Sequence, residues 1–102
     1  MNRPEVGNAY NEELRAVFLQ TIREAQRDTS VRAVVLTGAG KHFCTGVDLT
    51  GEAGLSAEAF RANTFRYDWI HELRRISVPV IAAIEGYAAG AGMAIALGCD
   101  IR

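Results

Sequence analysis

The longest apolar stretch of the sequence, VPVIAAIEGYAAGAGMAIALGC at positions 78–99, restricts most strongly what this chain can fold into. A membrane-spanning helix needs about 20 consecutive apolar residues, but Glu85 and several glycines interrupt this stretch. Short apolar runs bounded by glycine are typical of buried elements in globular proteins. The stretch therefore predicts a strand over 78–86, a glycine-rich turn and an apolar helix over 91–98 that is packed deep. We expect no membrane contact.

Two further patterns predict the first half of the chain. Over 11–28, apolar residues recur at three- and four-residue spacing behind a possible cap at Asn11, which predicts an amphipathic helix. The stripe consists of Leu14, Val17, Phe18, Ile22 and Ala25. The run VRAVVLT at 31–37 is β-branched and apolar on both faces, and the glycines of TGAG end it. This run predicts a strand covered on both sides.

A second helix is expected from near Ser56 to Ile76. Four of its large side chains are expected to face inward: Phe60, Trp69, Ile70 and Leu73. The resulting order of helices and strands is typical of a mixed α/β fold whose neighbouring strands are joined by helical crossovers. No linker or repeat divides the 102 residues, so we expect one domain over 1–102.

Charge and cysteine content narrow the classes of partner and cofactor. The formal net charge is −1 and no basic run is present, which argues against a nucleic-acid partner. Cys44 and Cys99 are too few and too far apart for a disulfide framework, and no signal-peptide pattern is seen, so we expect a cytoplasmic protein. Together with His42 and His71 they show no zinc-like spacing, so no metal is expected.

Each predicted strand runs into a loop that contains glycine. The second loop, GYAAGAG, leads into the helix at 91–98, whose first N–H groups have no partner within the helix and favour negative charge. An amide from the first loop beside them would complete an oxyanion hole, a pair of donors for an oxygen that becomes negative during a reaction. Phosphate-binding and dinucleotide-binding motifs do not fit, because His42 follows Gly40-Lys41 and because Phe43 and Ile95 stand where a third glycine is required.

Five segments together resemble the crotonases, also called the enoyl-CoA hydratase/isomerase family, in order and spacing. They are NRPEVGNAYN at 2–11, VRAVVLTGAG, HFCTGVDL, PVIAAIEGYAAGAG and the ending CDIR. The resemblance implies an α/β spiral of strand-strand-helix units, incomplete here at both ends, in a homo-oligomer that is a trimer or a pair of trimers. It also implies binding of an acyl-CoA thioester, with coenzyme A as part of the substrate and no tightly bound cofactor.

By the same resemblance, the backbone N–H groups of Val47 and Ala91 would form the oxyanion hole, in which an enolate-like charge develops on the thioester oxygen. The loop geometry would depend on three glycines: Gly46, Gly90 and Gly92. Coenzyme A would meet the chain near Val6, Thr45, Asp48 and Leu49. The sequence departs from the family at Glu5, where a basic residue is common, and at Ala91, where glycine is common.

The acid/base residues are where the sequence departs most from the family's hydratases. Their first glutamate lies three residues after the second oxyanion amide, where this chain has Ala94, and their second would lie beyond Arg102. Whether the chain is an enzyme therefore stays open. It could run isomerisation, thioester hydrolysis or decarboxylation, or it could be an inactive remnant that binds coenzyme A or another subunit. A third hypothesis is a small α/β protein unrelated to coenzyme A.

Two side-chain hypotheses compete with the backbone site. Asp48 could serve as a general base, although a turn carboxylate is favoured at such a position. Cys44 could be a nucleophile with His42 as its base. No third group is evident to orient that base, and a small buried cysteine is the commoner meaning.

Overall fold

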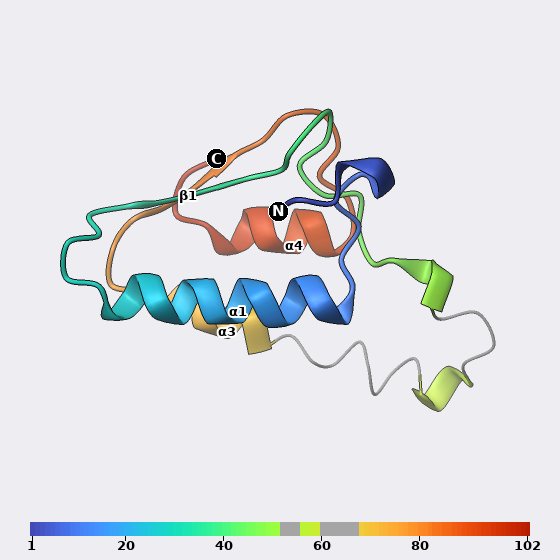
Figure 1. Ribbon diagram of the computed structural model, residues 1–102, viewed down its shortest axis with the longest axis horizontal. Coiled ribbons are helices and arrows are strands. Elements are labelled where there is room, and N and C mark those ends of the chain that lie inside the picture. Colours follow the sequence, from blue (N-terminus) through green and yellow to red (C-terminus); the bar gives the residue numbers. More distant parts are fainter. Residues whose placement is uncertain (52–55, 60–67) are drawn as a thin grey trace.

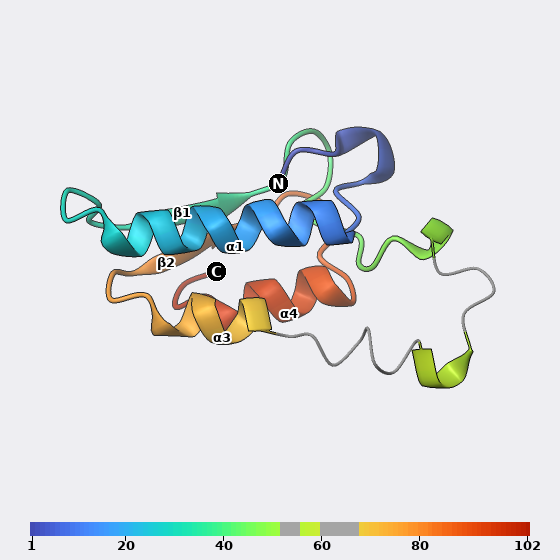
Figure 2. The same ribbon diagram turned by 60° about the horizontal axis from the view of Figure 1, so that its bottom comes forward.

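The computed structural model describes residues 1–51, 56–59 and 68–102 of the chain. In chain order the elements are the 3-10 helix η1 (Pro4–Val6), α1 (Glu12–Arg27), β1 (Val34–Thr37), the 3-10 helix η2 (Leu49–Gly51), α3 (Asp68–Arg75), β2 (Val80–Ala83) and α4 (Ala91–Gly98). Figure 1 shows β1 lying above α4 and α1, and Figure 2 shows α3 and α4 next to each other beneath α1.

The two strands form a parallel pair. Val34 lies opposite Val80, and Thr37 lies opposite Ala83. Parallel strands need a crossover connection, usually a helix, and the connection between β1 and β2 contains α3. The predicted joining of neighbouring strands by a helical crossover is confirmed.

The helices cover one face of this strand pair. Val80 is buried, and Val34 and Leu36 of the neighbouring strand pack against the same core. On the other face Val35 is 60% exposed. The expectation of a strand covered on both sides is therefore wrong for this chain, because apolar composition indicates what a strand can bury and not what lies over it.

Helix α1 begins where the sequence predicts. The Asn11 side chain accepts a hydrogen bond from the N–H of Leu14 at 2.9 Å, which satisfies one of the free donors of the first turn. Val17 belongs to the predicted apolar stripe but is 55% exposed. The buried side of the helix consists of Phe18, Leu19 and Ile22.

Helices α3 and α4 differ in how much of their surface is covered. Trp69 and Leu73 of α3 are buried, as predicted, and α3 contacts both α1 and α4. Phe60 lies outside the described residues. On α4, Met93 and Leu97 are 53% and 63% exposed. The helix is therefore not packed deep on all sides as expected, because only one of its sides faces the rest of the described chain.

Three aromatic rings connect the N-terminal segment to the helices. The Tyr10 and Trp69 ring centroids lie 5.1 Å apart, and Phe18 meets Trp69 edge to face at 6.3 Å. Such pairs stabilise a core beyond their buried area. The residues before α1 are thereby held against both α1 and α3.

Two leucines test this description of the core. Leu73 is 1% exposed and Leu97 is 63% exposed, so Leu73→Ala leaves a cavity whereas Leu97→Ala does not. We expect Leu73→Ala to lower the free energy of unfolding by about 2–5 kcal/mol and Leu97→Ala to lower it by less than about 1 kcal/mol. Urea unfolding followed by circular dichroism measures both, and equal losses would contradict the burial described.

Candidate functional site

The two glycine-bearing loops lie against each other. Cys44 of the first loop donates its N–H to the Tyr87 carbonyl and accepts from the Ala89 N–H, both at 3.0 Å. Gly46, two residues after Cys44, approaches Gly90 of the second loop. A Cβ placed on Gly90 would lie 3.6 Å from the Cα of Gly46. Gly46 and Gly90 have φ values of 113° and 50°, which side chains disfavour. The structure therefore brings together the two loops that the sequence predicts to form one site.

The residue after each of these glycines presents an N–H group. Val47 follows Gly46, and Ala91 follows Gly90 as the first residue of α4. Within the described part of the chain, neither N–H has a hydrogen-bond partner. At the start of a helix such a donor also carries partial positive charge. The loops thus offer two free donors, one of them at a helix N-terminus, beside a glycine-to-glycine contact.

Gly92 is required for the helix to approach the first loop. A Cβ at this position would lie 2.2 Å from the Cys44 carbonyl oxygen, far closer than atoms can pack. Gly92 is buried in the first turn of α4. Because it has no side chain, this turn can come close to the loop at 44–47.

The residues expected near coenzyme A lie on one continuous segment of surface. Thr45 donates its N–H to the Gly7 carbonyl at 3.0 Å and its hydroxyl to the Val6 carbonyl at 3.4 Å. Val6 is 41% exposed and Leu49 is 65% exposed. Figure 1 shows η1 lying beside the loop that follows β1. The structure therefore brings Val6 next to Thr45, with Asp48 and Leu49 directly after the Val47 donor.

Asp48 is a turn carboxylate. Its Oδ1 accepts from the Thr50 N–H at 3.1 Å and from the Thr50 hydroxyl, and its Oδ2 lies 2.9 Å from the Arg3 guanidinium. The Thr50 hydrogen bonds, and then Arg3, lower the pKa of Asp48 below its usual value. A carboxylate held in its charged form is a weak proton acceptor, which favours the turn hypothesis over the general-base hypothesis.

Cys44 and His42 do not form a nucleophile and its base. The Cys44 side chain is buried, and burial raises the pKa of its thiol, so the reactive thiolate is disfavoured. His42 uses Nδ1 to accept from the Tyr87 N–H at 3.3 Å, and the two rings pack against each other at a tilt of 33° with centroids 4.6 Å apart. This arrangement makes His42 a support of the second loop.

Ala94 lies one helical turn after Ala91. It donates its N–H to the Gly90 carbonyl at 3.1 Å and packs against the core. Its methyl group can neither donate nor accept a proton. The position where the resemblance leads us to expect a hydratase glutamate therefore has a side chain that cannot transfer a proton.

Sequence reasoning missed Asn8. Its side chain is fully buried and donates to the carbonyls of Ala39 and His42 at 2.9 and 2.6 Å, while its Oδ1 accepts from the Arg3 N–H at 2.8 Å. Its φ of 56° is one that asparagine tolerates better than most residues. The sequence signal for Asn8 is its place among polar residues just before a predicted helix. Polar residues at such positions usually indicate a helix cap, so the signal did not point to a buried side chain.

A separate groove of about 660 Å³ lies between α1 and β1. Its lining includes Val17 and Phe18 from the helix and Val35 and Leu36 from the strand. The predicted oxyanion and coenzyme A residues are absent from this lining. The groove is therefore distinct from the site at the glycine loops.

In the described parts of the chain, no cluster of three or more His, Cys, Asp or Glu side chains is arranged to hold a metal ion. The same residues contain no helix with the length and apolar character needed to cross a membrane.

The arrangement of these elements is shared with solved enzymes. An enoyl-CoA hydratase from Bacillus anthracis matches 98% of this chain with a TM-score of 0.90 and 34% identity. An enoyl-CoA hydratase from Polaromonas sp. JS666 matches 97% with a TM-score of 0.87 and 36% identity. The chain therefore has the crotonase fold, a mixed arrangement of helices and strands, as the sequence predicts.

The sequence comparisons agree with the fold. Residues 1–102 match the family described as Enoyl-CoA hydratase/isomerase, and the chain belongs to this family. It is 40% identical, over 99% of its length, to the 1,2-epoxyphenylacetyl-CoA isomerase of Escherichia coli (strain K12). The chain spans about 40% of the length of this relative and of the two solved hydratases.

Two glycines of α4 test the close approach of the loops. We expect Gly92→Ala to destabilise the chain by about 3 kcal/mol or more, because the new methyl group overlaps the Cys44 carbonyl. Gly98→Ala is the matched control, since its methyl would lie 3.3 Å from the flexible end of Leu73 and alanine favours helix. Thermal unfolding compares the two variants, and a Gly92→Ala midpoint as high as that of Gly98→Ala would contradict the contact.

Proposed function

We propose that this chain binds the thioester group of an acyl-CoA and holds its carbonyl oxygen with the N–H groups of Val47 and Ala91. The observation that carries the proposal is the pair of donors without partners that follow two glycines in contact. Buried N–H groups are nearly always paired in folded proteins, and Ala91 is buried whereas Val47 is 43% exposed. Together the two N–H groups would suit a ligand oxygen that enters from the exposed side, at Val47, and reaches the buried donor of Ala91.

The chemistry suited to such a site is formation of an enolate. When a proton leaves the carbon next to a thioester, negative charge moves to the carbonyl oxygen, and fixed donors stabilise that charge without reorganising. The α4 N-terminus adds its dipole at Ala91. Because the donors belong to the backbone, they tolerate Val at 47 and Ala at 91 in place of other residues.

The coenzyme A portion would lie along η1 and the loop after β1. The exposed side chains of Val6 and Leu49 and the main chain at Thr45 and Asp48 offer a partly apolar surface for the adenine end. Glu5 lies on the same 3-10 helix and would oppose a coenzyme phosphate rather than attract it. We therefore propose that binding here depends on main-chain and apolar contacts.

The side chain at position 94 bears on which reaction the proposed site could carry out. Ala94 lacks the proton-transfer group of a hydratase, so we favour an isomerisation or another enolate reaction whose acid lies in a further segment. A second candidate, a binding protein without catalysis, is favoured by the same alanine. Measurable turnover of crotonyl-CoA by the 102-residue chain would exclude this second candidate.

We also propose a homo-oligomer, a trimer or hexamer, in the cytoplasm. Val35 on the open sheet face and Met93 and Leu97 on α4 are each more than half exposed. Exposed apolar side chains of this size suit contact with further protein, which neighbouring subunits would supply in the proposed oligomer.

Two proline variants test the donors. Ala91→Pro and Val47→Pro each remove one proposed N–H. Proline is favoured at the first position of a helix, so Ala91→Pro should fold. With acetoacetyl-CoA at about 100 times its Kd, the unaltered chain should unfold about 10 °C higher than without ligand, and both variants should lose most of this shift. The readout is thermal unfolding with and without ligand.

Val47→Ala is the matched control, because it keeps the N–H and should keep the shift. Coenzyme A without an acyl group is the control ligand, since its binding does not need the oxyanion donors. An unchanged acetoacetyl-CoA shift in both proline variants would contradict the assignment of Val47 and Ala91.

A further inference from the structure

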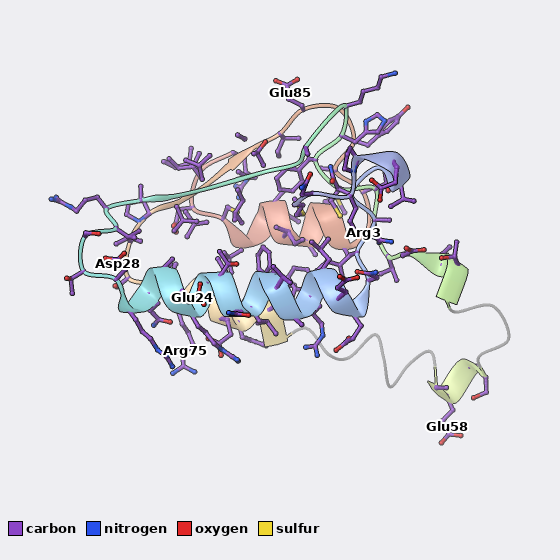
Figure 3. All side chains as sticks on the ribbon, viewed as in Figure 1. Arg3, Glu24, Asp28, Glu58, Arg75 and Glu85 are labelled. Carbon is purple, nitrogen blue, oxygen red and sulfur yellow. The ribbon has the colours of Figure 1, made fainter. Side chains whose placement is uncertain are left out.

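Arg3 connects several parts of the chain at the η1 end of the molecule. Its guanidinium Nη1 donates to the Ala9 carbonyl at 2.6 Å and lies 2.9 Å from the Asp48 carboxylate. The two side chains are only 25% and 11% exposed, so water screens this charge less than on an open surface. In Figure 3 the label of Arg3 lies near the N-terminal end of α1, and that of Asp28 lies near the C-terminal end.

The hydrogen bond to Ala9 begins a chain of peptide groups. The Ala9 carbonyl shares its peptide unit with the Tyr10 N–H, and this N–H donates to the Gly46 carbonyl at 2.7 Å. The Gly46 carbonyl in turn shares its peptide unit with the Val47 N–H. In a trans peptide the C=O and N–H point in opposite directions. Two peptide units therefore lead from the Arg3 guanidinium to the free Val47 donor.

We propose that Arg3 is a positioning residue that orients and polarises the Val47 N–H through these two peptide units. The inference rests on the function proposed above. Hydrogen bonds in a chain strengthen one another, and a cation at the carbonyl end makes the N–H at the far end a better donor. The N–H of Val47 would then bind most tightly to an oxygen that carries negative charge, which is the enolate form of the thioester.

The surrounding contacts suit this role. Gly46 has a φ of 113° and no side chain, so its peptide could rotate unless its carbonyl were held. The Tyr10 N–H donates to this carbonyl. The Tyr10 carbonyl accepts from the Asp48 N–H at 2.9 Å, on the far side of Val47. Asp48 completes the arrangement by fixing the guanidinium against the Ala9 carbonyl.

The test compares the enolate content of bound acetoacetyl-CoA, read from its near-ultraviolet absorbance, with the affinity for coenzyme A. For Arg3→Met we expect the enolate-to-keto ratio of the bound ligand to fall about tenfold, a smaller loss than removal of a donor would cause. The affinity for coenzyme A should change less than about twofold, since coenzyme A is proposed to meet the main chain of Asp48 and not the carboxylate that pairs with Arg3. Arg3→Lys should restore part of the ratio, because it keeps the charge.

Arg23→Met is the matched control, since Arg23 pairs with Glu72 at 3.3 Å on α1 and α3, away from the loops. It should leave both readouts unchanged. An enolate ratio in Arg3→Met equal to that of Arg23→Met would overturn the inference. So would equal losses of enolate ratio and coenzyme A affinity, because they would indicate general damage to the fold.

A second measurement separates this inference from the proposed function. In the ligand-free chain, the Val47 amide proton resonance should move upfield in Arg3→Met and its N–H vector should become more mobile, from an order parameter of about 0.85 towards 0.6. If the unaltered chain forms no enolate, the proposed function fails, and the Val47 signal still decides the role of Arg3. An unchanged Val47 signal would overturn that role.

Discussion

Backbone-to-backbone contact between the loops after β1 and β2 is the constraint on which the site depends. Side chains normally keep main chains several ångströms further apart, but Gly46, Gly90 and Gly92 remove this spacing at three successive points of contact. The consequence is chemical as well as geometric. Under the proposal made above, the N–H groups that follow Gly46 and Gly90 would face a common region, and neither would need a side chain to reach it.

The segment before α1 supplies the second support of the first loop. This segment forms no regular strand with the loop at 44–48, yet three main-chain hydrogen bonds join the two. The Gly7 carbonyl accepts one of them, and Tyr10 donates one through its N–H and accepts one through its carbonyl. Asn8 secures the same segment to the turn at 39–42 through two carbonyls. Ordering a glycine-containing loop costs more conformational entropy than ordering other loops, and these hydrogen bonds offset part of that cost. The proposed donor at Val47 is therefore held from the N-terminal side, whereas the donor at Ala91 is held by its own helix.

The local sequence pattern predicted where most helices and strands lie, but it predicted little of their burial and of their contacts with distant residues. The spacing of apolar residues and Asn11 located α1, and the β-branched runs located both strands, because these signals arise from neighbours in sequence. The apolar composition of the first strand and of the helix at 91–98 predicted too much burial for Val35, Met93 and Leu97, because composition reports a preference for burial and not the presence of a covering surface. The glycine loops were placed together through the family resemblance. The contacts of Arg3, Asn8 and Tyr10 could not be predicted in this way, since each joins main-chain groups distant in sequence.

This division suggests why a site of this kind can carry different reactions. The proposed oxyanion donors are main-chain groups held by glycines and by the segment before α1, so most substitutions at Val47 or Ala91 would leave them in place. The acid/base function depends on side chains such as the one at position 94, where a single change from carboxylate to methyl removes proton transfer without disturbing the helix. Recognition of the thioester and choice of reaction are thus physically separable. Under the proposed function, a chain with Ala94 would lose hydration and keep its capacity to hold an enolate, because the first depends on a side chain and the second on main-chain donors.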